Sequence, residues 1–291
     1  MRTLAPMSDC VPVDREPAIG ATYEGGDPTL LERLVEVVDY LEVTPDSIAL
    51  DTGNHLRLRP EVLDELEAVA GSVRIVAHGV GLSIGTASGH NEDYLRLIDD
   101  LLDAVPLHWH SEHLGYTTVD GEALGTMLSV PRTEESLDLI CERVIAIQER
   151  FDIPFLLENI ARYLPEPDGD YTEAEFLNAL CKRTGCGLVL DVYNLECDAH
   201  NHGLEIEPFL GALDWPSVHE LHVAGGTEVD GMKLDVHSQR AQLSTIALAK
   251  RAALDAPAIW GATYEFLPEA IPILGHAGIV DELTRLEAAL A

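Results

Sequence analysis

Short apolar runs alternate with amphipathic stretches along almost the whole chain. Brief apolar segments bounded by Gly, Pro or Asp are typical of strands, whereas apolar spacings of three and four indicate helices. The predicted strands are residues 17–22, 38–44, 73–78, 106–110, 153–158, 187–192, 219–223 and 258–265. The predicted helices are residues 28–40, 60–70, 91–104, 133–151, 173–184, 238–254 and 280–290.

Eight strand–helix units in series predict an α/β fold, a closed (β/α)8 TIM barrel. The alternative is a doubly wound open sheet, which usually carries a Gly-rich phosphate loop after its first strand. Here the first strand leads into residues 23–28, Tyr-Glu-Gly-Gly-Asp-Pro, which lack that fingerprint. Because no low-complexity segment or linker divides the chain, we expect one metal-binding barrel domain over residues 15–291, after an N-terminal extension of residues 1–14.

The charge balance narrows the possible partners. The 291 residues include 51 acidic and 18 basic side chains, which give a net charge of −33. Only Lys182, Lys233 and Lys250 are lysines. A surface this negative repels nucleic acids and anionic membranes, so we expect neither as a partner. An acidic, Lys-poor surface is typical of a protein that stays soluble in a high-salt, halophilic cytoplasm.

Cysteine usage and the N-terminal sequence also indicate a cytoplasmic protein. The chain has five Cys and no CxxC motif, which favours free thiols in a reducing compartment over a disulfide framework. The first residues contain no apolar segment of the kind a signal peptide needs. No apolar run approaches the ~20 residues of a membrane-spanning helix.

His and carboxylate residues gather where the predicted strands end. In a (β/α)8 barrel, active sites lie at the C-terminal ends of the strands, so these side chains should face one another. The residues at or just beyond the strand ends are His78, His113, Glu158, Asp191, Asn194, His222, Asp235, His237 and Glu265. For His108, beside Trp109, we expect a hydrogen-bonded core histidine rather than a metal ligand, and no role is assigned to His110.

This set of side chains indicates a metal centre. Borderline divalent ions take imidazole nitrogen and carboxylate oxygen as ligands, and a carboxylate can bridge two ions. A mixed set of this size suits two or three metals better than one. Asp235 and His237 are two residues apart, so in an extended chain both side chains face the same way and can bind one ion. Without cations, the carboxylates would repel one another.

The same residues resemble a known family. The matching segments are AHGVGLSIG, HSEHLGY, LLENIARY, LVLDVYNLECDAHNHG, VHELHVAGG, GMKLDVHS and YEFLPEAIP, in the family's order over roughly residues 15–270. With these segments the chain resembles the multinuclear non-haem iron-dependent oxidases. That resemblance implies a xylose-isomerase-like barrel that holds two or three iron ions.

The resemblance also implies roles for individual residues. His78 and His113 match the early His ligands, and Glu158 matches the Glu that bridges two irons. The ligands of the second iron match Asp191, His222 and Glu265, and those of the third match Asn194, Asp235 and His237. The catalytic set would be Glu158, Asp191, His222 and Glu265. His202 lies in an Asn-His-Gly motif typical of the family, but it receives no ligand role.

The implied activity is an O2-dependent modification of a Cys residue in a ribosomally synthesised precursor peptide. O2 would be the co-substrate. A separate partner protein would bind the leader peptide, since no such domain is fused here. The chain departs from the family pattern at Asp235-Val-His237, where Thr is common in the middle, and at Glu265-Phe-Leu, where Glu-Arg-Asp is common. The second departure removes charges beside the site, so the resemblance does not identify the substrate.

Other functions remain open from the residues alone. Zinc- or manganese-dependent hydrolases, endonucleases and sugar isomerases use similar barrels and similar ligands. The net charge argues against an endonuclease unless salt screens it. A sugar isomerase usually needs a Lys near its metals, and only Lys233 lies close to a ligand segment. A non-catalytic metal-binding protein is the remaining alternative, which a filled coordination shell would favour.

Overall fold

The computed structural model describes residues 16–53, 55–165 and 169–291, and a closed parallel barrel is its centre. The strand order around the barrel is β1-β2-β5-β6-β9-β10-β11-β14, closed by pairing of β14 with β1. The eight barrel strands are β1 (Ala18–Thr22), β2 (Tyr40–Val43), β5 (Arg74–Gly79), β6 (Leu107–His113), β9 (Phe155–Glu158), β10 (Gly187–Asp191), β11 (Val218–Val223) and β14 (Gly261–Tyr264). Each coincides with a predicted strand, so the predicted barrel is confirmed.

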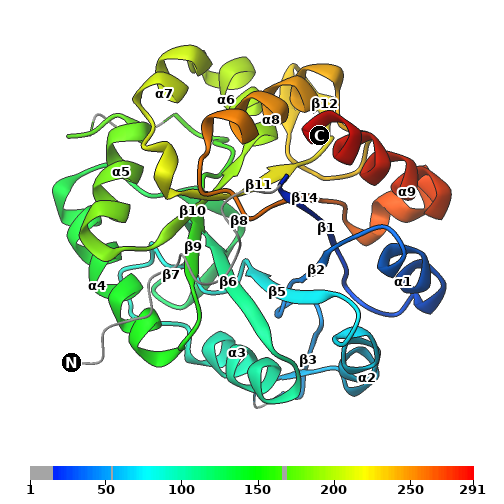
Figure 1. Ribbon diagram of the computed structural model, residues 1–291. Helices are drawn as coiled ribbons and strands as arrows, with labels where there is room; N and C mark the ends of the chain where they lie inside the picture. Colours follow the sequence, from blue (N-terminus) through cyan, green and yellow to red (C-terminus); the bar gives the residue numbers. More distant parts are fainter. Residues whose placement is uncertain (1–15, 54, 166–168) are drawn as a thin grey trace.

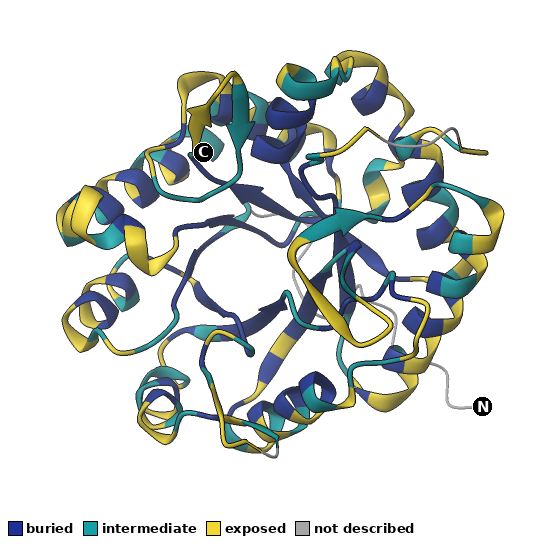
Figure 2. Cartoon of the chain, turned by 180° about the vertical axis from the view of Figure 1, so that it is seen from behind, coloured by how far each residue is buried: buried dark blue, intermediate teal, exposed yellow. Residues whose placement is uncertain are grey.

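Helices surround the barrel (Figure 1). They are α1 (Pro28–Val35), α2 (Pro60–Val69), α3 (Glu92–Ala104), α4 (Glu134–Arg150), α5 (Glu173–Thr184), α6 (Val192–His202), α7 (Ile206–Ala212), α8 (Leu243–Asp255) and α9 (Ile271–Leu290), with short 3-10 turns at Trp215–Ser217 and Pro268–Ala270. Their buried faces turn towards the strands, while the exposed residues lie on the outside (Figure 2). The main hydrophobic core therefore fills the layer between strands and helices.

Several helix boundaries differ from the prediction. Helix α1 ends at Val35, five residues early, because the chain must turn before β2 begins at Tyr40. Helix α9 begins nine residues earlier than predicted and bends at Gly275, whose φ of 68° breaks the helical path. The capping box of Thr172 and Glu175 starts α5, as the sequence indicated. The expected extension, residues 1–14, lies outside the described residues.

The sequence analysis missed three β-hairpins and two helices. The hairpins follow β2, β6 and β11, and they are β3 (Ala49–Asp51) with β4 (Leu56–Leu58), β7 (Gly115–Val119) with β8 (Glu122–Ser129), and β12 (Thr227–Val229) with β13 (Met232–Leu234). Two of them turn at Asp-Gly pairs with positive φ at both residues, the signal of a type I′ turn. Helix α6 was missed because its first seven residues are all buried, which leaves no amphipathic pattern.

A layer of large side chains fills the barrel below the strand ends. It contains Tyr40, Val76, Trp109, Leu156, Val189 and Trp260. The Tyr40 ring fits because Gly20 and Gly261 face it: a Cβ on Gly20 would lie 2.2 Å from the ring, and one on Gly261 would lie 2.6 Å away. The Tyr40 hydroxyl hydrogen bonds to Glu220 and Thr263, so the ring cannot move aside without breaking them.

This packing predicts the effect of a single methyl group. Gly20→Ala should lower the free energy of unfolding by about 1–3 kcal/mol, because it overpacks the barrel interior. The matched control is Gly211→Ala in α7, where an added Cβ meets nothing within 4 Å. Since Ala favours a helix over Gly, we expect this control to be neutral or stabilising by up to about 1 kcal/mol. Urea denaturation of both variants tests the difference, and equal stabilities would contradict it.

Candidate metal centre

The barrel brings the predicted site residues to one end. His78, His113, Glu158, Asp191 and His222 lie at or next to the C-terminal ends of five barrel strands. Neighbouring strands hold them in register, with His113 beside Glu158 and Asp191 beside His222. The remaining four come from segments that follow strands: Glu265 after β14, Asn194 in the first turn of α6, and Asp235 and His237 after β13.

Eight of these nine side chains form three overlapping groups. Within each group, one ligand atom per residue lies within 4.8 Å of the others. The groups are His78–His113–Glu158, then Glu158–Asp191–His222–Glu265, then Asp191–Asp235–His237. Because Glu158 and Asp191 each belong to two groups, the arrangement can hold adjacent ions that share a carboxylate.

Glu158 lies where the first two groups meet. Its Oε2 atom is 3.0 Å from Nε2 of His78, 3.6 Å from Nε2 of His113 and 3.6 Å from Nδ1 of His222. Its other oxygen accepts a hydrogen bond of 3.3 Å from the side-chain amide of Asn194. Asn194 therefore holds the Glu158 carboxylate in place while Oε2 faces the three imidazoles.

Buried polar atoms that make no hydrogen bond, several of which face one another as His–carboxylate pairs, show that the site suits cations. Among the described residues, eight of the nine predicted ligands have a buried nitrogen or oxygen with no hydrogen-bond partner. These atoms are His78 Nε2, Glu158 Oε2, Asp191 Oδ2, Asn194 Oδ1, His222 Nδ1, Asp235 Oδ1, His237 Nε2 and Glu265 Oε2. Buried polar atoms are rarely left unpaired, because each costs roughly 1–3 kcal/mol. Metal ions would satisfy all of them, so the residues fit the predicted multinuclear centre.

Hydrogen bonds on the far side of each ring orient two of the imidazoles. Nδ1 of His78 is 2.9 Å from the hydroxyl of Ser111, and that hydroxyl donates to the carbonyl of Ala77. Nδ1 of His113 is 2.9 Å from the carbonyl of Gly79. Both Nδ1 atoms therefore act as donors, which leaves Nε2 of each ring without a proton and free to bind metal.

Burial and charge act together on the pKa values here. Burial lowers the pKa of His222, but the carboxylates of Glu265, Glu42 and Glu158 outweigh it and raise the pKa well above the usual value. Burial and the charges of Asp235, Glu158 and Glu265 raise the pKa of Asp191 well above its usual value. The site thus concentrates negative charge in a buried region, which bound cations would neutralise.

The expectation of an extended chain at Asp235 and His237 was wrong. The two side chains do converge, with Nε2 of His237 2.7 Å from Oδ1 of Asp235. However, these residues lie beyond β13, and His237 has a φ of 45°, in the left-handed region. The left-handed backbone at His237 therefore departs from the extended chain that the sequence analysis assumed. Such strained backbone persists where the surroundings fix it, and it is common at functional sites.

The sequence analysis missed Glu42. This residue of β2 is fully buried, and it forms a further group with His78 and His222 in which ligand atoms lie within 4.8 Å. The sequence did carry a signal, because Glu42 is a carboxylate within the apolar strand 38–44. That the Glu42 side chain points into the barrel becomes clear only from the closed arrangement of the strands.

Three of the eight His residues outside these groups were singled out in the sequence analysis. His108 lies outside the groups as expected, but it is exposed on β6, so the expected core position was wrong. The Nε2 atom of His110 is 3.0 Å from the Tyr94 hydroxyl, and burial lowers the pKa of this imidazole to about 3. The Nε2 atom of His202 is 2.8 Å from the carbonyl of Arg162. Hydrogen bonds thus account for His110 and His202, as in ordinary structural histidines.

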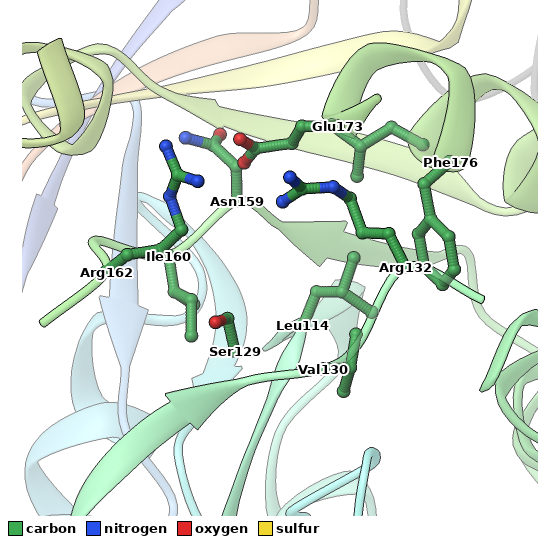
Figure 3. Close-up of a pocket in the computed structure, with 10 residues that line it drawn as sticks. Leu114, Ser129, Val130, Arg132, Asn159, Ile160, Arg162, Glu173 and Phe176 are labelled. Atoms are coloured by element: carbon green, nitrogen blue, oxygen red, sulfur yellow. The ribbon is translucent and has the colours of Figure 1, made fainter. Parts of the chain in front are cut away.

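A small pocket adjoins the predicted ligands. Leu114, which follows His113, lines it together with Asn159 and Ile160, which follow Glu158. Figure 3 shows the side chains of Arg132 and Arg162 extending into this region near Asn159 and Glu173. The Asn159 side chain also hydrogen bonds to the backbone N–H and carbonyl of Asp191, which ties the end of β9 to the end of β10.

The sequence profile of the RiPP precursor modification enzymes MbnB/TglH/ChrH matches residues 26–263. A UPF0276 protein of Caulobacter vibrioides is 34% identical over 217 residues, which are 75% of this chain and 75% of that protein. A UPF0276 protein of Chromobacterium violaceum is 36% identical over 178 residues, which are 60% of this chain and 63% of that protein. The chain therefore belongs to the MbnB/TglH/ChrH family of peptide-modifying enzymes, which confirms the resemblance.

Solved structures with the same architecture include sugar epimerases. The D-psicose 3-epimerase of Clostridium cellulolyticum H10 superposes with a TM-score of 0.57 at 14% identity, covering 94% of this chain and 96% of that chain. The IolI protein with a bound zinc atom gives a TM-score of 0.56 at 13% identity, covering 94% and 97%. At such low identity these likenesses show the fold alone, a xylose-isomerase-like barrel.

The shared position of Glu158 predicts the effect of removing its charge. Glu158→Gln should lose at least one metal equivalent relative to the unaltered protein, because an amide cannot bridge two cations as a carboxylate does. The measurement is elemental analysis of the purified protein. His108→Phe is the control, and its metal content should stay intact because the residue is exposed on β6. Full metal content in Glu158→Gln would contradict the bridging role.

Proposed function

We propose that the protein is a multinuclear iron-dependent oxidoreductase that uses O2 to modify a Cys residue of a ribosomally synthesised precursor peptide. Membership of a family of peptide-modifying enzymes supports the substrate class. The converging His and carboxylate groups support a centre of two or three ions. A separate protein that binds the leader peptide is part of this proposal.

Iron is supported over other metals by the group of His78, His113 and Glu158. Two imidazoles and one carboxylate are the ligand set of many non-haem iron(II) oxygenases, which leave coordination positions open for substrate and O2. Bound iron would supply those positions and the electrons that O2 needs, whereas zinc has no redox chemistry. No described Cys belongs to the ligand groups, so a peptide thiolate would be the one soft ligand there.

Different residues of the chain would hold different parts of such a metal centre. Glu158 and Asp191 are shared between groups and so would fix the spacing of neighbouring ions. Asn194 steadies Glu158 through its amide, and the backbone N–H of Asn194 donates to Oδ1 of Asp191, which leaves Oδ2 for metal. His222 and Glu265 complete the buried middle group and would keep water away from it.

Among the described ligand residues, those at the two ends of the centre are more exposed than those in its middle. The side chains of Glu158 and His222 are 1% and 0% exposed, whereas that of His113 is 15% exposed. At the other end, Asp235 and His237 are each 14% exposed. A peptide would therefore approach the outer groups, and the buried middle group would stay out of its reach.

Two alternatives have weaker support. The sugar isomerase alternative depends on a likeness of fold at 14% identity. The endonuclease alternative is disfavoured by the net charge of −33, which repels nucleic acid.

The cytoplasm remains our proposed location. Within residues 16–53, 55–165 and 169–291, no helix has the length and apolarity needed to cross a membrane.

Reconstitution with a peptide tests the proposed activity. The protein is co-expressed with a short Cys-bearing precursor peptide, purified without oxygen and loaded with iron(II). On exposure to O2, we expect O2 uptake and a mass change localised to one Cys by tandem mass spectrometry. The matched controls are the zinc-loaded protein and a peptide with Ser in place of that Cys, and neither should react.

Three results would contradict this proposal. One is an unchanged peptide after the iron-loaded protein has been incubated with both O2 and a leader-binding partner protein. Another is the same mass change in the Ser peptide. The third is activity of a zinc- or manganese-loaded protein on DNA or a sugar, which would favour a hydrolase or an isomerase instead.

A further inference from the structure

The His222 ring lies between carboxylates on both sides. Its Nε2 atom is 3.1 Å from Oε2 of Glu42 and hydrogen bonds to it. Its Nδ1 atom is 3.1 Å from Oε1 of Glu265 and has no hydrogen-bond partner among the described residues. A His222 ring that binds a metal ion is neutral and carries one proton. The bond to Glu42 places that proton on Nε2 and leaves the Nδ1 lone pair facing the metal centre.

We infer that Glu42 is a positioning residue that selects the nitrogen through which His222 binds metal. This inference rests on the proposed metal centre and adds a residue outside the predicted ligand set. The Glu42 carboxylate accepts the Nε2 proton of His222 and so holds Nδ1 towards Glu158 and Glu265. Outer partners of this kind fix the orientation of a ligating imidazole and raise its basicity.

His222 differs from the other oriented imidazoles of the site. His78 and His113 hydrogen bond through Nδ1 to a neutral hydroxyl and a neutral carbonyl, and they turn Nε2 inward. His222 does the reverse, and its outer partner is a carboxylate. Hydrogen bonds to charged acceptors are about twice as strong as bonds to neutral ones, so this ring is held most firmly and donates most strongly to a metal.

Glu42 is buried inside the barrel, so it is not a solvent-exposed surface carboxylate. Glu42 is 0% exposed, and strand pairing sets it beside Thr22 on one side and Val76 on the other. Its Oε1 atom has no hydrogen-bond partner within the described chain. Glu42 therefore uses its other oxygen, Oε2, for the hydrogen bond with His222 in this buried position.

A second buried carboxylate lies near the same nitrogen but cannot replace Glu42. Oε1 of Glu220 is 3.8 Å from Nε2 of His222, too far for a hydrogen bond. Both of its oxygens already accept hydrogen bonds, from Tyr40 and Thr263 at Oε1 and from Trp109 at Oε2. Glu220 thus places a carboxylate close to Nε2 of His222 without accepting a hydrogen bond from it. For this reason Glu220 is a matched control for Glu42.

Glu42 could instead bind a metal itself, since Glu42, His78 and His222 also bring ligand atoms within 4.8 Å of one another. The two roles are exclusive at Nε2 of His222, because a nitrogen that donates a proton to Glu42 cannot also bind a metal. The tautomer of His222 in the metal-loaded protein therefore decides between them.

Nuclear magnetic resonance of the zinc-loaded protein, labelled with ¹⁵N-histidine, tests the inference. Zinc is the probe because it is diamagnetic and borderline in ligand preference. In the unaltered protein, long-range ¹H–¹⁵N correlations should show His222 protonated at Nε2 and metal-bound at Nδ1. His78 and His113 should show the opposite pattern, protonated at Nδ1 and bound at Nε2.

Variants of the two carboxylates provide the comparison. Glu42→Ala should remove the fixed tautomer of His222 and weaken zinc binding roughly 10–100-fold, measured by competition with a chelator. Glu42→Gln should keep the tautomer, because its amide oxygen still accepts, but the Nε2 proton should shift upfield as the hydrogen bond weakens. Glu220→Gln should leave both that proton shift and the tautomer unchanged. The Gln variants decide the question if the Ala variant does not fold.

The outcomes separate this inference from the proposed function. A His222 bound through Nε2 in the unaltered protein, or equal shifts in the Glu42 and Glu220 variants, would overturn the inference alone. Loss of a whole zinc equivalent from Glu42→Gln at saturating zinc would make Glu42 a ligand and would also overturn it. An unaltered protein whose histidines bind no zinc at all would instead contradict the metal centre on which the proposed function depends.

Discussion

One buried oxygen atom, Oε2 of Glu158, determines the arrangement of the site. Three imidazole nitrogens lie within 3.0 to 3.6 Å of it, yet it has no hydrogen-bond partner among the described residues. A carboxylate oxygen in that position is stable only if positive charge is shared around it. The neighbouring groups also bring carboxylates, Asp191 and Glu265, next to imidazoles, so this end of the barrel can hold several cations.

The closed parallel barrel is what makes this convergence possible. Parallel strands end together, so residues that are 187 positions apart in the chain, His78 and Glu265, reach one rim. Beneath the rim, Tyr40 and Trp109 fill the interior and hydrogen bond to Glu220, which closes the barrel below the site. Glu220 connects the packed layer to the polar layer above it, because its Oε1 atom also lies 3.8 Å from Nε2 of His222.

The sequence was a good guide wherever a local pattern decided the structure. Apolar runs located all eight barrel strands, and the residues just beyond them proved to lie together. It was a poor guide where tertiary contacts decided. Helix α6 carries no amphipathic pattern because it is buried, and the turn at His237 depends on a left-handed backbone that no strand rule predicts. Glu42 became visible only once the closed barrel had set its direction. The Asp-Gly turns of two hairpins were readable and were overlooked.

The most direct test of a multinuclear centre is anomalous diffraction at the iron edge, from crystals of protein loaded with iron(II) in the absence of oxygen. We expect at least two iron peaks at the rim of the barrel, with neighbouring peaks on either side of the Glu158 carboxylate. A single peak, or peaks away from His78, Glu158 and His222, would contradict the account.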